Sequence, residues 1–94
     1  MSTRYQAKSG FIKRTIAGET LLVPVGATTR EFNGMVMLSE TGAYLWELLA
    51  QPTSIDELVA KMLSEFDAAE DVIRADVQEF IENGMKDELI LEVA

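Results

Sequence analysis

Residues 35–49 decide how this chain folds, and they read MVMLSETGAYLWELL. The first four residues are apolar and suit a short strand, and from Ser39 onward the apolar residues follow a helical spacing. Ser39 is a favoured N-cap, because its hydroxyl can accept a hydrogen bond from a backbone N–H of the first turn. The segment therefore predicts a strand that leads directly into a helix with Leu45, Trp46 and Leu49 on its apolar face.

Two further strands are expected before this segment, at residues 11–16 and 19–25. The turn between them, Ala17-Gly18, suits a tight hairpin because glycine tolerates the positive φ that such turns need. A polar connection over residues 26–34, which includes Asn33-Gly34, then leads to the strand at 35–38. These pieces predict an antiparallel meander of three strands.

Two helices and a strand are expected downstream. Ser54 and Glu57 have the spacing of a capping box, and the apolar residues behind them recur with helical spacing. These residues are Ile55, Leu58, Val59, Met62, Leu63 and Phe66. A third helix carries the apolar stripe Ile73, Val77, Phe80, Ile81 and Gly84, and Asn83-Gly84 predicts its end. Residues 88–93 alternate and predict a closing strand with Leu89, Leu91 and Val93 on one face.

The order of these elements predicts one α+β domain over residues 11–94. It has a three-stranded antiparallel sheet, then three helices, then a short C-terminal strand, an arrangement like a winged helix-turn-helix. Residues 1–10 are polar and are expected to be a flexible N-terminal arm. No stretch approaches the about 18 apolar residues of a membrane span, and no signal peptide is recognisable, so a cytoplasmic protein without membrane contact is expected.

The composition argues against catalysis. Among 94 residues there is no Cys and no His. The commonest general base, the commonest metal ligands and the cysteine nucleophile are therefore missing. No catalytic residue, metal site or cofactor is expected, and a binding module is the favoured class.

The charge distribution argues against nucleic acid as a partner. The net charge is −8, and residues 39–94 carry fourteen acidic and three basic residues. A winged-helix protein would read DNA with its third helix, which here carries five acidic residues against Arg74 alone. Such a helix would be repelled by phosphates, so a DNA-binding regulator is the weaker alternative.

Four stretches resemble the PqqD family, which is named for pyrroloquinoline quinone (PQQ) synthesis protein D. Residues 18–26 read GETLLVPVG, and residues 32–49 read FNGMVMLSETGAYLWELL. Residues 54–59, SIDELV, and 74–81, RADVQEFI, are similar to the second and third helices of the family. The resemblance extends over most of residues 11–93.

The resemblance implies recognition of a ribosomally synthesised and post-translationally modified peptide (RiPP). Members of the family bind the leader of such a precursor and present it to a modifying enzyme, often a radical S-adenosylmethionine (radical SAM) enzyme. The leader typically adds as a strand to an edge of the sheet, beside the third helix. Carried onto this chain, the edge would be Met35, Val36, Met37 and Leu38.

The helix wall of such a site is expected from one flank of the third helix, with Arg74, Gln78, Ile81 and Met85. Arg74 could there anchor an acidic residue of the leader. The opposite flank, with Val72 and Asp76, stays open as an alternative. Each of these residues also has a purely structural interpretation. Met35 or Met37 would then fill the core, Trp46 would be a core anchor, and Arg74 would pair with Glu70 along the helix.

The function also has an alternative. A general protein-interaction module would need the same exposed edge without any precursor peptide. An unpaired edge further allows two copies to pair, so a homodimer is compatible with the sequence. Which peptide is bound, and whether the pathway makes PQQ or another product, does not follow from the residues.

Overall fold

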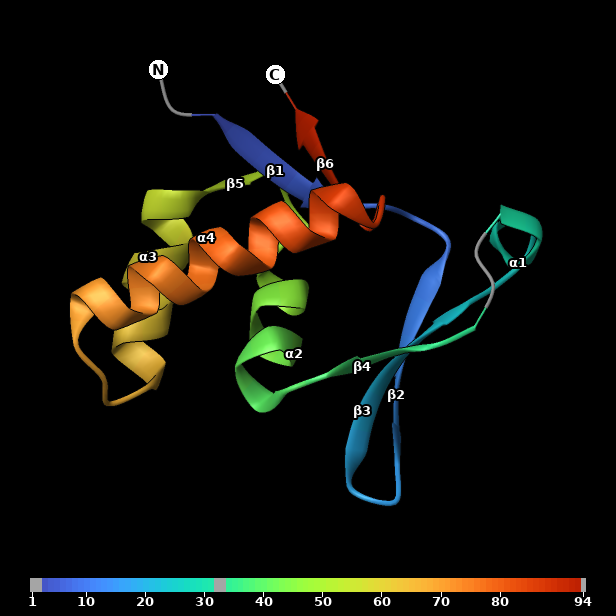
Figure 1. Cartoon of the computed structure of the whole chain (residues 1–94), viewed down its shortest axis with the longest axis horizontal. Coiled ribbons are helices and arrows are strands. Elements are labelled where there is room, and N and C mark those ends of the chain that lie inside the picture. Colours follow the sequence, from blue (N-terminus) through green and yellow to red (C-terminus); the bar gives the residue numbers. More distant parts are fainter. Residues whose placement is uncertain (1–2, 32–33, 94) are drawn as a thin grey trace.

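The computed structural model describes residues 3–31 and 34–93. Its elements are β1 (Arg4–Ala7), β2 (Phe11–Ile16), β3 (Glu19–Pro24), α1 (Thr28–Glu31), β4 (Val36–Leu38), α2 (Glu40–Leu48), β5 (Thr53–Ser54), α3 (Ile55–Glu65), α4 (Glu70–Lys86) and β6 (Ile90–Val93). The strands form two separate antiparallel sheets, in the orders β2-β3-β4 and β5-β1-β6 (Figure 1). The predicted α+β architecture is confirmed, and the second sheet adds to it.

The β2-β3-β4 sheet is the predicted meander. Ala17 and Gly18 have φ angles of 53° and 81°, the left-handed conformation of a two-residue hairpin loop. The hairpin pairs Ile16 with Glu19, and β4 adds to β3 with Val36 opposite Leu22. The connection to β4 contains the short helix α1 where the sequence predicted only polar loop, and Asn33 lies outside the described residues.

The helices α2 and α3 begin at their predicted caps, whereas α4 begins after Ala69 without a side-chain cap. The predicted apolar stripes face the core, except that Leu63 of α3 is exposed. The N–H of Gly42 donates to Ser39 Oγ at 3.1 Å, and the N–H of Glu57 donates to Ser54 Oγ at 3.2 Å. Their apolar faces meet in one core, whose buried members are Leu45, Leu49, Leu58, Val59, Met62, Ile73, Val77, Ile81 and Ile90. The predicted end of α4 at Asn83-Gly84 is wrong, because the helix continues to Lys86 and packs Gly84 against Ile90.

The N-terminal segment is not the flexible arm that its polar sequence suggested. Residues 4–7 form β1, the central strand between β5 and β6. The N–H of Ala7 donates to the carbonyl of Leu49 at 2.9 Å, and the N–H of Lys8 donates to the carbonyl of Leu89 at 2.8 Å. Backbone pairing with segments far along the chain orders this segment in spite of its polar side chains. The first and last strands, β1 and β6, consequently lie side by side (Figure 1).

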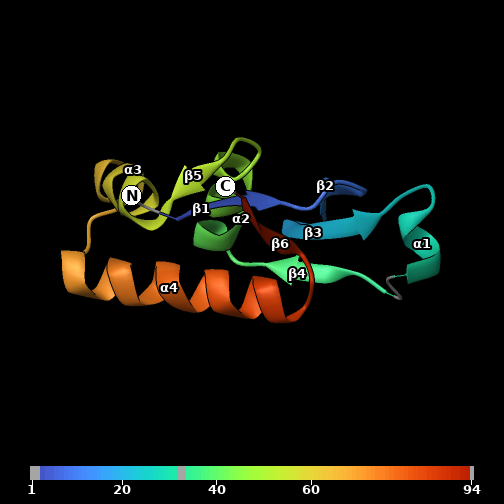
Figure 2. The same cartoon turned by 90° about the horizontal axis from the view of Figure 1, so that it is seen from above.

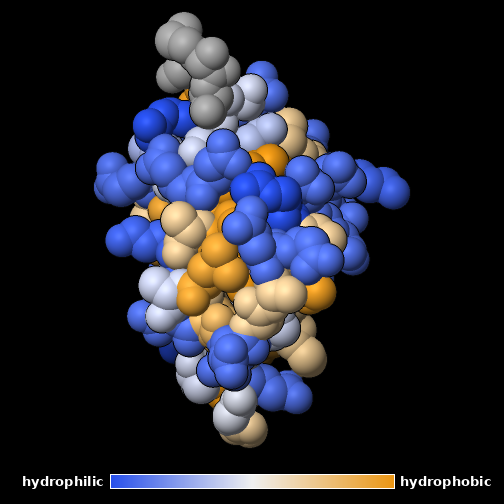
Figure 3. Space-filling model, turned by 90° about the vertical axis from the view of Figure 1, so that its left-hand side faces the viewer, coloured by the Kyte–Doolittle hydropathy of each residue, from blue (hydrophilic) through white to orange (hydrophobic). Residues whose placement is uncertain are grey.

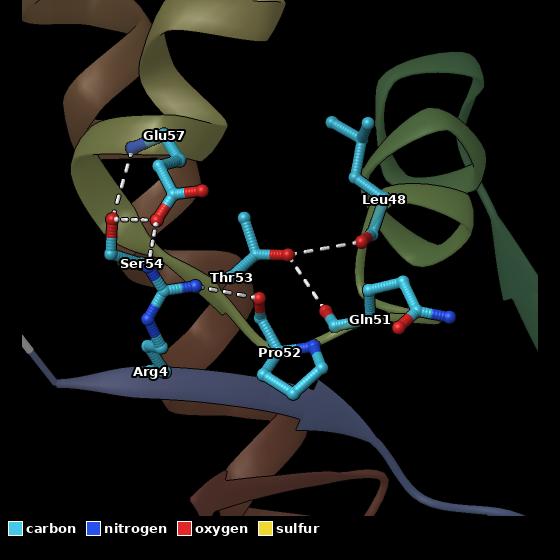
Figure 4. A network of polar contacts seen from close by, with 7 residues as sticks. All are labelled: Arg4, Leu48, Gln51, Pro52, Thr53, Ser54 and Glu57. Atoms are coloured by element: carbon cyan, nitrogen blue, oxygen red, sulfur yellow. Dashed lines mark hydrogen bonds and ion pairs between the residues drawn. The ribbon is translucent and has the colours of Figure 1, made fainter. Parts of the chain in front are cut away.

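A polar network joins β1 to the start of α3 (Figure 4). Arg4 donates to the carbonyl of Pro52 at 3.0 Å and forms an ion pair of 3.0 Å with Glu57. The Thr53 hydroxyl is buried and contacts the carbonyls of Leu48 and Gln51 at 3.1 and 2.7 Å. These contacts satisfy the backbone between α2 and α3 and attach β1 to it.

The closing strand buries a different face from the predicted one. Leu89 and Ile90 are buried, whereas Leu91 is exposed, so the expected face of Leu89, Leu91 and Val93 is wrong. Leu89 precedes the strand, and its N–H bonds back to the carbonyl of Gly84 at 2.7 Å. That bond ends α4 tightly and brings Ile90 into the core.

Candidate functional site

The outer edge of β4 is an unpaired strand edge. β4 is the last strand of the β2-β3-β4 sheet, so its far side carries backbone groups without a neighbouring strand in the described part of the chain. In an antiparallel ladder, opposing residues alternate between hydrogen-bonded and non-hydrogen-bonded pairs, and the pair that closes a two-residue hairpin is hydrogen-bonded. Ile16 and Glu19 close the hairpin here, so Glu19 and Leu21 bond to β2, while the next residue along, Leu22, bonds to β4. Leu22 and Val36 are therefore a hydrogen-bonded pair, and Leu21 and Met37 are a non-hydrogen-bonded pair. The N–H and C=O of Met37 therefore point outward.

Figure 2 shows β4 and α4 on the same side of the molecule. The side chains there form a groove, which we call the β4–α4 groove. It consists of two adjoining pockets that share Phe80 and Asn83. The apolar pocket is lined mainly by Leu22, Val36, Met37, Leu38, Trp46, Phe80, Leu89 and Ile90. The acidic pocket lies against the start of α2 and is lined by Ser39, Thr41, Gly42, Leu45, Met62, Asp76, Glu79, Phe80 and Asn83. The apolar pocket lies along β4, and the acidic pocket begins at Ser39, directly after the strand, so an extended segment that follows β4 and continues past Leu38 would reach both.

The local sequence explains which flank of α4 lines the groove. Asp76, Phe80, Asn83 and Asp87 recur every three or four residues, so one flank of α4 presents them together. Gly42 is buried where α2 meets this flank, and a Cβ there would lie 3.3 Å from Phe80 Cε1. The absence of a side chain at position 42 lets the Phe80 ring approach α2 closely.

The β4 residues divide between the groove and the outer surface. Val36 and Leu38 are half-buried, while Met35 and Met37 are 62% and 63% exposed. The interpretation that one of the two methionines fills the core is therefore wrong. Trp46 packs edge-on against Phe11, with ring centroids 6.3 Å apart, and it forms the floor of the apolar pocket.

The helix residues expected as the wall do not face β4. Arg74 and Gln78 lie on the other flank of α4, in a pocket with Thr3, Tyr5 and Asp56. Ile81 is a core residue with 2% exposure. The structure instead brings Asp76, the residue of the alternative flank, to the groove.

Met85 follows the same pattern. It is exposed and shares the helix flank of Arg74 and Gln78, away from the residues that line the groove. None of the four α4 residues expected at the site thus lines either pocket of the β4–α4 groove.

Arg74 has partners of its own on that flank. Its guanidinium donates to Asp56 Oδ1 at 2.8 Å and lies 3.6 Å from Glu70 Oε2. The hydrogen bond to Asp56 raises the pKa of Arg74 above its ordinary value, against a smaller lowering by desolvation. The interpretation of Arg74 as a partner of Glu70 is confirmed, and Asp56 is an additional partner.

Apolar surface by itself does not single out the groove. Figure 3 shows the end of the molecule formed by α3 and the start of α4, where apolar residues are exposed among hydrophilic ones. Leu63 of α3 and Val72 of α4 are among the exposed large side chains. What distinguishes the β4–α4 groove is the unpaired backbone beside it. Over the described residues, no cluster of potential metal ligands occurs, and no helix is long and apolar enough to cross a membrane.

The sequence predicted the strand that borders the candidate groove, but not the helix residues that line it. Phe80, Asn83 and Asp87 were not expected at the site, although their spacing with Asp76 was a visible signal. The flank of Arg74 and Gln78 faces the β5-β1-β6 sheet, because Tyr5 of β1 and Ser54 of β5 line a pocket with these two residues. An N-terminal segment that is expected to be flexible gives no reason to prefer one flank of α4 over the other.

Two comparisons with known proteins bear on this arrangement. The sequence profile of the family described as Coenzyme PQQ synthesis protein D (PqqD) matches residues 19–90. A solved structure titled TbiB1 in complex with the TbiA(beta) leader peptide superposes with a TM-score of 0.72 at 19% sequence identity. The match covers 95% of this chain and 98% of that one, so the two share a fold. No curated protein matches the chain.

Proposed function

Because the chain belongs to the family of coenzyme PQQ synthesis protein D, we propose that it binds the leader of a ribosomally synthesised precursor peptide and presents that peptide to a modifying enzyme. The observation that carries the proposal is the unpaired edge of β4 beside the β4–α4 groove. A leader that adds as a strand to β4 would bond to the outward N–H and C=O of Met37. The structure of TbiB1, a protein of the same fold, was solved in complex with a leader peptide, which supports the proposal that this fold binds leader peptides.

The groove would supply specificity to such a strand. Side chains of an extended peptide alternate between the two faces of the sheet. Those on the inner face would enter the groove, while those on the outer face would lie beside Met37, whose flexible thioether adapts to different neighbours. Val36 and Leu38 line the groove from the strand, and Phe80 lines it from the helix.

The chain's role in this proposal is binding rather than catalysis. A chain without Cys or His leaves the redox or nucleophilic chemistry to its partner. The partner we propose is a radical SAM enzyme or another enzyme that modifies peptides. Nucleic acid is a poor ligand for the groove, because Asp76 and Glu79 would repel phosphates.

The outward backbone of Met37 provides the test. The probe is a synthetic leader of the precursor peptide encoded beside this chain, titrated while backbone amide signals are followed by NMR. We expect the Met37 amide to shift strongly and Met37→Pro to weaken binding about tenfold or more, since it removes the donor. Thr15→Pro is the matched control, because the alternation also points the Thr15 N–H outward, on the opposite edge of the same sheet.

The outcomes separate binding from folding. Far-UV circular dichroism of both proline variants should match that of the parent. Val36→Pro removes a donor that bonds to β3 and should destabilise the fold instead. A folded Met37→Pro variant that binds the leader with undiminished affinity would exclude strand addition at β4.

A further inference from the structure

The polar half of the β4–α4 groove is negatively charged. Asp76 and Glu79 line the acidic pocket together with neutral residues, and Asp87 lines the adjoining apolar pocket. Neither pocket is lined by Lys or Arg. A peptide along β4 therefore passes carboxylates on the helix side.

The cations of β2 and α4 do not line the groove. Arg74 lies on the other flank of α4 and is held by Asp56 and Glu70. Lys13 is paired with Glu47. Lys86, in the last turn of α4, is exposed and lines neither pocket. An acidic residue of the peptide would find no cation in the groove, contrary to the role first expected of Arg74.

The start of α2 is the one feature of opposite sign. A helix N-terminus is equivalent to roughly half a positive charge. Here the N–H of Gly42 is already satisfied by Ser39 Oγ, and the carboxylate of Glu40 in the first turn offsets the positive end of the helix dipole. The negative charges of Asp76 and Glu79 outweigh the remaining partial positive charge of the helix N-terminus, so the local potential is negative.

We propose that the peptide bound in the β4–α4 groove carries a basic side chain, Lys or Arg, facing Asp76 and Glu79. The inference rests on the proposed function, since it takes strand addition to β4 as given. The apolar pocket takes an apolar side chain from the same face of the peptide. The groove therefore selects peptides that carry one basic and one apolar side chain on that face. The charge complementarity selects an extended basic peptide over an acidic one.

The experiment is a selection from displayed random 12-residue peptides on three proteins. One is the parent chain. The second is the double variant Asp76→Lys with Glu79→Lys, which reverses the charge of the groove. The third is Glu65→Lys with Glu82→Lys, which makes the same change in net charge at exposed positions that do not line the groove.

We expect Lys or Arg to be enriched at one position of the peptides selected on the parent and on the Glu65/Glu82 variant. Peptides selected on the Asp76/Glu79 variant should carry Asp or Glu there instead. Replacing the enriched basic residue by Met in a synthetic peptide should weaken binding to the parent by about 1.5- to fivefold, the range expected for exposed charge pairs. Selected peptides without a basic preference, or with the same preference on all three proteins, would overturn the inference.

Met37→Pro distinguishes this failure from a failure of the proposed function. If selected peptides lose affinity for the folded Met37→Pro variant but show no preference for charge, strand addition stands and the basic side chain is refuted. If basic peptides bind Met37→Pro as well as they bind the parent, they bind elsewhere, and both ideas fail.

Discussion

Gly84 shows at the scale of one residue how the end of α4 is joined to the core. The residue is buried inside the helix, and a Cβ there would lie 2.7 Å from Ile90 Cγ1. Alanine is favoured over glycine in helices by about 1 kcal/mol, whereas overpacking a core costs about 1–3 kcal/mol. Ile90 is buried and β-branched, so it cannot easily move aside, and the steric cost should outweigh the gain in helix propensity.

We therefore predict that Gly84→Ala lowers the free energy of unfolding by about 1 kcal/mol, measured by urea denaturation. The matched comparison is the same exchange in an Ile90→Ala background, which removes Cδ1 and Cγ1 of residue 90 and leaves its Cβ 3.2 Å away. There Gly84→Ala should stabilise the protein, since the gain in helix propensity outweighs this milder contact. A stabilising Gly84→Ala in the parent chain would show that the space beside Ile90 is not limiting.

At the scale of elements, residues 4–7 are an ordered central strand, β1, where a flexible arm was expected. It is central in the β5-β1-β6 sheet, and the amides of Ala7 and Lys8 donate to carbonyls of other segments. β2 is an edge strand, and the alternation of its ladder points the Thr15 amide toward solvent. The two strands should therefore differ in how well their amides are protected.

Hydrogen exchange of the free protein tests this difference. We predict that the amides of Ala7 and Lys8 exchange about a hundredfold more slowly than that of Thr15, after correction for intrinsic rates. The Arg14 amide, which faces β3 on the same hairpin, is the internal control and should also be protected. If the amides of Ala7 and Lys8 exchanged as fast as that of Thr15, the N-terminal segment would be flexible in solution, as first expected.

The elements that the sequence predicts well are those with a strong local signal. The hairpin turn at Ala17-Gly18 and the caps at Ser39 and Ser54 appear where their residue types predict them. β1 lacks such a signal, because its order comes from backbone bonds to segments more than 40 residues away. Short-range periodicity does not contain that information.

In the candidate site, too, the part with a local signal could be predicted and the part set by tertiary pairing could not. Its strand, β4, could be predicted as a strand because residues 35–38 are an apolar run before a helix cap. Its helix flank depended on which side of α4 the second sheet covers. That sheet joins β1 and β6 from opposite ends of the chain. Helical periodicity therefore could not decide between the expected flank of Arg74 and the alternative flank of Asp76.

At the scale of the whole molecule, the net charge of −8 is the dominant electrostatic feature. Ion pairs such as Arg4 with Glu57 and Arg74 with Asp56 lie on the surface, where each contributes about 0–1 kcal/mol. Repulsion among the excess carboxylates opposes the compact state, and salt screens both the attraction and the repulsion. With twice as many acidic as basic residues, the repulsion should outweigh the attraction.

We predict that raising NaCl from about 20 to about 300 mM increases the Tm of the free protein by about 4–8 °C, equivalent to on the order of 1 kcal/mol. The variant Glu65→Lys with Glu82→Lys, whose net charge is −4, should respond about half as strongly. KCl should act like NaCl, because the effect is one of ionic strength. A Tm that falls with added salt would mean that the surface ion pairs outweigh the repulsion. Binding of a basic peptide should respond in the opposite direction, since the same salt screens the attraction to Asp76 and Glu79.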